Sequence, residues 1–206
     1  MEKFKETDER ILTVARRLFS QNGIVNIEMN DIVKELGCSR STLYRHFSSK
    51  EDILYVLAGN SVVRIMDAAI IPPRKTFQNG YEAFSWQLRM QVNFMLNNVD
   101  ELCFIRDFDY FFASGVPDSK ELKRFETLII TTRGRKEMLD SLTRGMEDGS
   151  IRKLEDAKLV LYSLINACIG FAQRVLPREG IYKRELGYSR EMIECHLELL
   201  LHSIQS

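Results

Sequence analysis

The apolar positions of the first fifty residues repeat with the spacing of amphipathic helices. The first apolar face consists of Ile11, Leu12, Ala15, Leu18 and Phe19. A second segment runs from about Met29 to Leu36 and ends at Gly37, a residue that can adopt the left-handed conformation of a tight turn. Ser39 is placed to cap a short third helix from Arg40 to Phe47. The pattern predicts three helices, with a turn at 37–39 between the second and the third.

Helical periodicity continues through the rest of the chain, without the alternation typical of strands. Ser48-Ser49-Lys50-Glu51 has the form of a capping box, so a fourth helix is expected from there to about Ile71, ended by Pro72-Pro73. Further helices are expected at about 76–98, 101–112, 119–146, 155–176 and 189–204. The linker-like stretches are 72–73, 114–117, 148–150 and 177–187. We predict an all-α fold with a three-helix helix-turn-helix domain over residues 1–52 and a helical domain over residues 53–206.

Composition and charge exclude a protein that binds nucleic acid through its overall charge. The 206 residues are 45% hydrophobic, as in ordinary globular proteins, and the 29 Lys and Arg residues equal the 29 Asp and Glu residues in number. Because a neutral chain has no global basic field, contact with nucleic acid requires a local positive patch.

Cysteine usage and hydropathy bear on location. The four cysteines form no CxxC pair and stand in or beside helical patterns, so we expect buried free thiols and a reducing compartment. The mixed charges of the N-terminus differ from a secretory signal. The longest uncharged stretch, 159–173, is shorter than the ~20 apolar residues of a membrane span and is interpreted as a buried helix. We expect a cytoplasmic protein with no membrane partner.

Residues 37–50 form a local positive patch without an acidic residue. In a helix-turn-helix unit the second helix lies in the major groove of DNA with its N-terminal residues at the base edges. Ser41 and Thr42 are small and polar enough to approach bases, and Arg40 can take guanine in bidentate fashion. The side chains expected to face phosphates, which position the helix without reading sequence, are Tyr44, Arg45, His46 and Lys50.

These residues carry a family resemblance. The string Ile-Leu-x-x-Ala-x-x-Leu-Phe-x-x-x-Gly occupies 11–23, and Asp-Ile-Val-x-x-Leu-Gly-Cys-Ser-x-Ser-Thr-Leu-Tyr-x-His-Phe-x-Ser-Lys-Glu occupies 31–51. Together they resemble the DNA-binding domain of TetR-family transcriptional regulators over the first quarter of the chain. The resemblance implies that the second domain binds an effector and dimerises.

The resemblance also assigns positions to individual residues. Ser39 starts the recognition helix, and Arg40, Ser41, Thr42 and Tyr44 occupy its contact positions. His46 and Lys50 occupy backbone-contact positions. Glu28 departs from the family, which often has a capping threonine there that touches phosphate. A glutamate suits a helix N-terminus but repels phosphate, so no DNA contact is assigned to it.

The resemblance implies a homodimer formed by the last two helices, which bind their twofold mates as a four-helix bundle. The apolar faces proposed for that contact consist of Leu161, Leu164, Ile165, Cys168, Phe171, Ile193, Leu197, Leu200 and Ile204. A twofold dimer places its recognition helices one DNA turn, or a multiple of it, apart. The expected partner is therefore a double-stranded, pseudo-palindromic operator.

The segment 77–112 is rich in aromatic residues, which fits either a filled core or a pocket for an apolar or aromatic effector. The candidate lining consists of Phe77, Trp86, Met90, Phe94, Phe104, Phe108 and Phe111. Polar groups for such a pocket are available at Gln87, Asn93, Asn97 and Arg106. An effector would act by favouring a dimer geometry with the wrong separation of recognition helices.

Other chemistry is not supported. Asp107 and Asp109 are two residues apart and point to different helix sides, and His202 stands six residues from His196, so no metal site is expected. HExxH, GxSxG, Walker A and GxGxxG motifs are absent, so no catalytic residue, cofactor or enzymatic activity is expected. The leading hypothesis is a repressor released by a small effector. The alternative is a TetR-type DNA-binding protein controlled by a protein partner or with an architectural role.

Overall fold

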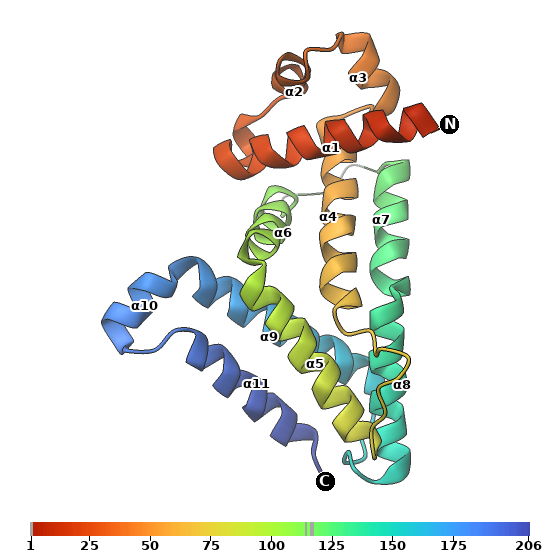
Figure 1. Cartoon of the computed structure of the whole chain (residues 1–206), viewed down its shortest axis with the longest axis vertical. Helices are drawn as coiled ribbons and strands as arrows, with labels where there is room; N and C mark the ends of the chain where they lie inside the picture. The colour runs from red at the N-terminus through yellow and green to blue at the C-terminus, as the bar shows by residue number, and fades with distance from the viewer. Residues whose placement is uncertain (1, 114, 116–117) are drawn as a thin grey trace. The chain divides into compact units, whose positions relative to one another are not determined.

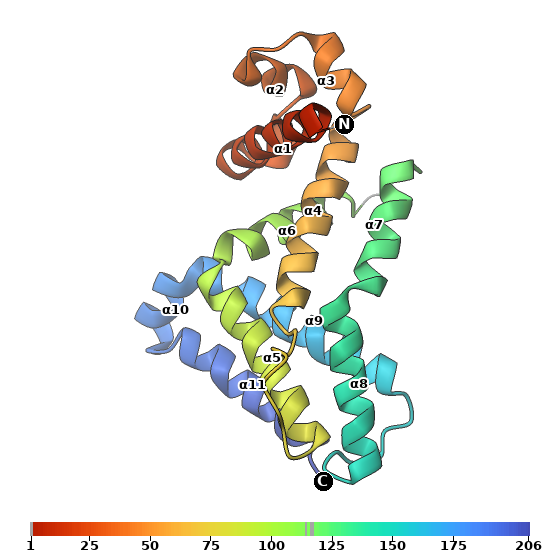
Figure 2. The same ribbon diagram turned by 45° about the vertical axis from the view of Figure 1, so that its right-hand side comes forward.

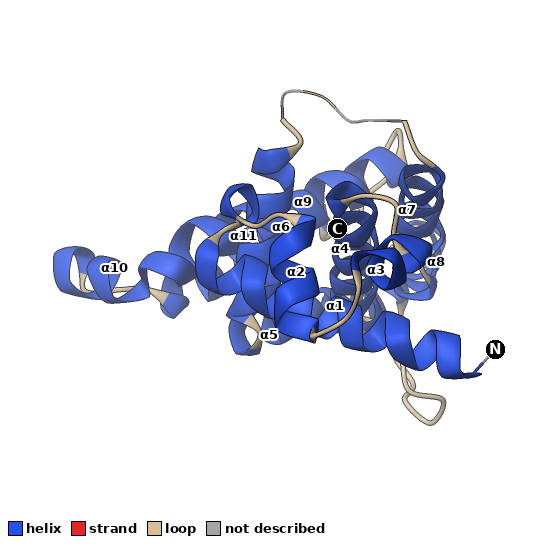
Figure 3. Cartoon of the chain, turned by 90° about the horizontal axis from the view of Figure 1, so that it is seen from above, coloured by secondary structure: helices blue, strands red, loops and turns tan. Residues whose placement is uncertain are grey.

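The computed structural model describes residues 2–113, 115 and 118–206, and its regular elements within those ranges are helices (Figures 1 and 3). The single extended pairing among the described residues is an isolated antiparallel bridge between Ile151 and Gln205. The predicted all-α fold is confirmed. The predicted linker at 114–117 lies outside the described residues except for Gly115.

The chain divides into two compact units. The first comprises residues 1–62 and 104–129, and the second comprises residues 63–103 and 130–206. The chain passes from one unit to the other inside three helices, α4 (Lys50–Asp67), α6 (Val99–Phe111) and α7 (Lys120–Thr131). The first unit therefore holds the helix-turn-helix segment together with most of α4, α6 and α7.

The first unit is built on a core of residues spaced three or four apart along its helices. Its N-terminal elements are α1 (Glu2–Asn22), η1 (Ile24–Asn26), α2 (Met29–Leu36) and α3 (Arg40–His46). The core contains the apolar face predicted for the first helix together with the inward positions of the next three, namely Ile11, Ala15, Phe19, Ile32, Leu43, Phe47, Ile53 and Leu54. Burial of these side chains holds α3 on α1 and α2 and leaves the opposite face of α3 exposed.

The second unit is a bundle in which α5 packs on α8 and α9, and α9 packs on α11 (Figures 1 and 2). Its elements are α5 (Gly80–Asn97), α8 (Arg133–Asp148), α9 (Ala157–Val175), η2 (Leu176–Arg178), α10 (Glu179–Leu186) and α11 (Arg190–Ile204). Gly80 lies so close to α8 that a Cβ there would be 2.1 Å from the backbone nitrogen of Gly145. This contact brings the start of α5 directly against the end of α8.

Three predicted boundaries shift by a few residues. The fourth helix ends at Asp67, before Pro72-Pro73, in a turn where the amide of Ala69 donates to the carbonyl of Met66 over 3.0 Å. The amide of Asp52 donates to Ser49 rather than Ser48, so the cap is one residue later than the predicted capping box. The fifth helix begins at Gly80 because the side chain of Asn79 caps it.

Two larger predictions were wrong. The single helix expected at 119–146 is divided at Thr132, whose ψ of 140° is extended, although no proline or glycine pair precedes it. The reason is tertiary, because Gly134 packs directly on the backbone of Met66. The expected linker at 177–187 forms η2 and α10, with Pro177 in the first turn of η2, where its missing N–H costs no helical hydrogen bond.

The thiols and the apolar stretch also differ in part from expectation. Cys168 is buried, and that burial raises its pKa to about 12, whereas Cys195 is exposed and Cys38 and Cys103 are half-buried. The segment Ala157–Leu186 contains an 18-residue stretch with a mean hydropathy of 1.5, so by length and composition alone it could cross a membrane. Core helices of soluble proteins pass the same test, and one face of α9 is buried in its own unit.

Candidate functional site

The turn between α2 and α3 has the local chemistry that the sequence predicts. Gly37 ends α2 in the left-handed conformation with φ of 64°, and its amide donates to the carbonyl of Lys34 over 3.2 Å. The Ser39 hydroxyl accepts from the amide of Thr42 over 3.1 Å and so caps α3. Leu43 is fully buried and anchors α3 in the core. These contacts fix which face of α3 is turned outward.

The outward face of α3 carries most of the predicted base-edge residues. Ser39, Arg40, Ser41, Tyr44 and Arg45 are exposed, and Tyr44 is an exposed large aromatic side chain at 51%. Thr42 is half-buried, with its hydroxyl 2.8 Å from that of Ser39. Seven of the eight predicted DNA-contact residues therefore lie on α3 and its cap, and the six described here are exposed or half-buried.

Arg40 has a positioning partner that the sequence reading missed. The Asn30 side-chain oxygen in α2 accepts from Nε of Arg40 over 2.8 Å. This bond engages Nε. The two terminal nitrogens of the Arg40 guanidinium remain available to donate two parallel hydrogen bonds to a base edge. Asn30 stands ten residues from Arg40, so no local spacing signals the pair.

His46 is not turned toward solvent, contrary to its expected backbone contact. Its side chain is 1% exposed, and its Nδ1 lies 2.5 Å from a carboxylate oxygen of Asp8 in α1. The ring therefore joins the end of α3 to α1 inside the unit. A partner 38 residues away gives no sequence signal.

Lys50 is also turned inward. Its ammonium donates to the carbonyls of Ile27 over 2.9 Å and Ile24 over 3.4 Å and lies 3.2 Å from a carboxylate oxygen of Glu28. Glu28 caps α2 as part of a reciprocal capping box with Asp31. The glutamate that departs from the family pattern is thus the counter-charge of Lys50. Within residues 37–50, Arg40 and Arg45 are therefore the positively charged side chains that remain exposed.

We predict that Lys50→Met destabilises the protein by about 2–3 kcal/mol, because two buried carbonyls and one carboxylate lose their donor. The matched control is Lys34→Met, whose side chain is 73% exposed and forms a long ion pair of 3.9 Å, and it should change stability by less than about 0.5 kcal/mol. Urea unfolding of both variants measures this. Unchanged stability of Lys50→Met, with a DNA salt dependence lowered by about one phosphate contact, would restore the phosphate role instead.

The seven predicted effector-lining residues are divided between the two units. Phe104, Phe108 and Phe111 belong to the first unit, where the Arg16 guanidinium lies 3.8 Å from the ring centroid of Phe104. Phe108 packs in an aromatic cluster with Tyr55, whose ring centroid is 6.1 Å away. The other four, in the second unit, are Phe77, Trp86, Met90 and Phe94. Of the four polar candidates, Gln87 is buried, whereas Asn93, Asn97 and Arg106 are exposed.

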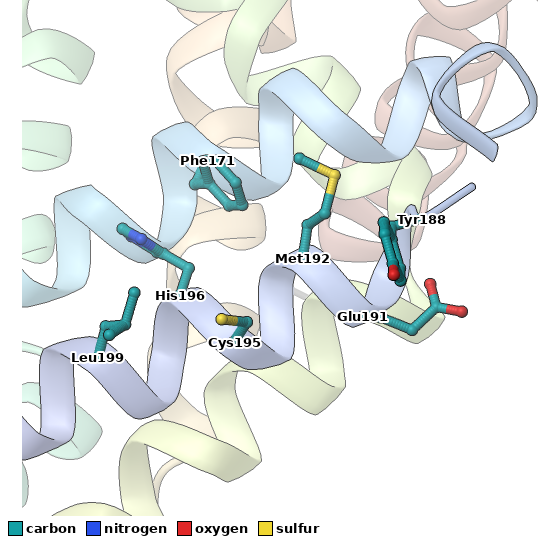
Figure 4. Close-up of a pocket in the computed structure, with 7 residues that line it drawn as sticks. All are labelled: Phe171, Tyr188, Glu191, Met192, Cys195, His196 and Leu199. Carbon is teal, nitrogen blue, oxygen red and sulfur yellow. The ribbon is translucent and has the colours of Figure 1, made fainter. Parts of the chain in front are cut away.

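An apolar groove lies along α9 and α11 (Figure 4). It has a volume of about 470 Å³ and is lined by Phe171, Tyr188, Glu191, Met192, Cys195, His196 and Leu199. The His196 ring stacks on Phe171 with centroids 4.6 Å apart. Leu199 is 66% exposed and adds to the apolar surface of the groove.

Most of the residues predicted for the dimer face lie in the core of the single chain. Seven of the nine are buried inside their own unit, namely Leu161, Leu164, Ile165, Cys168, Ile193, Leu197 and Ile204. Phe171 and Leu200 are half-buried. Helical periodicity alone cannot distinguish which of two apolar stripes faces the protomer's own core. The apolar side chains that stay more than 60% exposed in this part of the second unit are Leu159, Tyr188 and Leu199.

Residues 11–56 match the family model for bacterial regulatory proteins of the tetR family. The chain is 35% identical over 97 residues to an HTH-type transcriptional regulator of Staphylococcus aureus strain USA300, covering 46% of this chain and 50% of that protein. It is 51% identical over 51 residues to another from strain MRSA252, covering 25% of this chain and 28% of that one. The chain spans about half the length, or less, of the curated relatives it matches.

Solved structures share the whole fold at low identity. The TetR family transcriptional regulator PfmR from Thermus thermophilus is 22% identical with a TM-score of 0.62, covering 94% of this chain and 97% of that one. A protein of Saccharomonospora viridis solved in complex with choline is 23% identical with a TM-score of 0.70, covering 98% and 99%. The names of these relatives describe regulators and not enzymes, in agreement with the sequence-based expectation.

Proposed function

We propose that this chain, whose residues 11–56 match the family model for bacterial regulatory proteins of the tetR family, is a cytoplasmic, homodimeric transcriptional regulator that binds a pseudo-palindromic DNA operator. The observation that carries this proposal is the capped, anchored α3, which exposes Arg40, Ser41, Tyr44 and Arg45 on one face. In a protein of zero net charge, a cation-bearing helix of this kind is suited to the major groove.

Within this interface Arg40 reads a base, and Ser41, Thr42 and Tyr44 contact bases or the adjoining backbone. Arg45 contacts phosphate. His46 and Lys50 support the helix from inside the unit, since both have intramolecular partners. The number of phosphates neutralised by residues 37–50 of each protomer is therefore lower than the sequence suggests.

The groove along α9 and α11 is proposed as the homodimer contact. Its lining is almost wholly apolar, and the apolar side chains of Leu159 and Leu199 are exposed to water in the single chain. A twofold axis would place the same helices of a second copy against these side chains, so that the same surface of each protomer forms the contact. Two half-sites held by one dimer then bind as a single strong site.

The regulator is proposed to act as a repressor that a small molecule releases from DNA. A relative of the same fold has been solved with choline, so this fold accommodates small molecules in at least one protein. Release follows if the molecule binds better to a dimer geometry that misplaces the two α3 helices.

We predict that Arg40→Ala lowers discrimination at one base position of each half-site by about 1–3 kcal/mol and leaves the other positions unchanged. Competition binding with operator duplexes that carry single base changes measures this. The matched control, Arg45→Ala, should weaken binding to all of these duplexes equally and reduce the salt dependence. Equal losses on every duplex for Arg40→Ala would assign Arg40 to phosphate instead.

A further inference from the structure

The second unit contains a buried group of polar side chains that lack hydrogen-bond partners. Gln87 and Gln91 are both 0% exposed, and they stand four residues apart on one face of α5. Neither amide atom of Gln87 has a partner, and the amide oxygen of Gln91 has none. Each such group costs about 1–3 kcal/mol relative to a hydrogen-bonded one, so several together call for a partner from outside the chain, such as a ligand or water.

Arg135, in the first turn of α8, belongs to the same group. The amide nitrogen of Gln91 donates to the sulfur of Met66 over 3.4 Å, and the Arg135 guanidinium approaches the same sulfur at 3.8 Å. The Met66 sulfur thus lies between the two donors. The Nε of Arg135 is buried without a partner.

The charge of Arg135 is not balanced by the chain. No carboxylate of the described residues forms an ion pair with it, and its guanidinium lies 5.1 Å from the ring centroid of Tyr162 in α9. Burial lowers the pKa of Arg135, and the contact with Tyr162 opposes that effect. The positive end of the α8 dipole adds to the positive potential at this position.

The nitrogen donors of the group lack a strong acceptor. Those of Gln91 and Arg135 both approach the Met66 thioether, which is a weak acceptor, and the amide nitrogen of Gln87, one turn away on α5, has no acceptor. What these nitrogen donors lack is a strong acceptor with a negative charge, whereas the amide oxygens of Gln87 and Gln91 lack a donor such as a water molecule or a hydroxyl group. One guanidinium balances one negative charge, which favours a monocarboxylate over a phosphate dianion, although its planar fork matches the geometry of both groups.

We propose that Gln87, Gln91 and Arg135 bind the carboxylate of a small organic acid, which takes the place of the Met66 thioether between them. This inference rests on the proposed function, because the acid would be the effector that releases the regulator from DNA. Met66 is an unbranched, adaptable side chain and can move without breaking a helix. The rest of the acid would lie against Met66 and Tyr162. The effector is therefore an acid with an apolar body rather than a purely apolar molecule.

The test uses the full-length protein and thermal unfolding. The probes are straight-chain monocarboxylates of two to eight carbons and benzoate, each paired with its neutral amide, with inorganic phosphate as a separate arm. At least one carboxylate should bind the wild-type protein about tenfold or more tightly than its amide, and Arg135→Gln should lose that preference. The matched control is Arg144→Gln on the exposed side of α8, which should behave as the wild type.

A second variant tests the site without any probe. Gln87→Leu should raise the unfolding midpoint of the ligand-free protein by about 2–4 °C, because it removes a buried amide that has no partner. A lowered midpoint would show that Gln87 has a structural role and would overturn the inference. Three other results would also overturn the inference. They are that no carboxylate binds more tightly than its amide, that phosphate alone binds, or that Arg135→Gln keeps the preference for the carboxylate.

Operator binding by the same proteins separates this inference from the proposed function. Loss of operator affinity on addition of the preferred carboxylate, in the wild type but not in Arg135→Gln, supports both. Carboxylate binding through Arg135 without any operator binding leaves the site intact and overturns the proposed function. Operator binding without a preference for the carboxylate supports the proposed function and overturns the carboxylate site.

Discussion

Leu199→Arg is expected to convert the dimer to monomers and to lower operator affinity by about 10²–10⁴-fold. Leu199 is 66% exposed at the edge of the apolar groove on α11, where a twofold contact would bury it. An arginine there would bring a charge into an apolar interface in both copies, at a cost that a modest helical interface cannot offset. Loss of the dimer leaves each α3 with a single half-site. Analytical ultracentrifugation and operator titration measure the two effects.

Ile130→Arg is the matched control for this prediction. Ile130 is 61% exposed on α7 and lies outside the groove, so the same substitution adds the same charge to a different surface. It should leave the dimer and the operator affinity unchanged. A Leu199→Arg protein that sediments as a dimer would show that the groove is not the contact between protomers.

Gly134→Ala is expected to lower the free energy of unfolding by about 3 kcal/mol or to prevent folding, because the core cannot accept the added atom. A Cβ at Gly134 would lie 1.9 Å from the carbonyl oxygen of Met66 and 2.5 Å from its carbonyl carbon. Both are backbone atoms of α4, so the clash is relieved only by moving α4 away from α8. Urea unfolding followed by circular dichroism measures the loss.

The control for Gly134 is Gly180→Ala in α10. No heavy atom lies within 4 Å of a Cβ built there, so alanine should stabilise the helix by about 0.5–1 kcal/mol. Equal stability of Gly134→Ala and Gly180→Ala would contradict the close approach of α8 to Met66. That approach also supports the carboxylate inference, because it places the start of α8 beside the end of α4.

Local chemistry explains which parts of the fold the sequence predicts. The turn at Gly37, the Ser39 cap and the apolar face of α1 depend on residues within four positions of one another, and the structure confirms all three. The division of the expected helix at Thr132 depends on Gly134 meeting Met66, about 68 positions away. No periodicity within a helix carries that contact.

The same distinction between local and long-range contacts applies to the candidate site. Exposure of Arg40 and Tyr44 follows from the spacing of Leu43 and Phe47, which are buried on the opposite side of α3. The inward turn of His46 and Lys50 depends on Asp8 and on the carbonyls of Ile24 and Ile27, which come from other segments. A positive residue beside a recognition helix is therefore a contact candidate only when its own fold offers it no buried partner.

The proposed function requires sequence-specific DNA binding by α3. The decisive measurement is selection of duplexes from a randomised library by the purified protein at two salt concentrations, in parallel with Arg40→Ala. We expect the wild-type protein to retain a pseudo-palindrome with steep salt dependence, and Arg40→Ala to retain the same palindrome with one base pair of each half-site relaxed. The wild-type protein would be tested at low salt after dialysis to remove small molecules. If it then retained no common sequence, sequence-specific DNA binding by α3 would be contradicted.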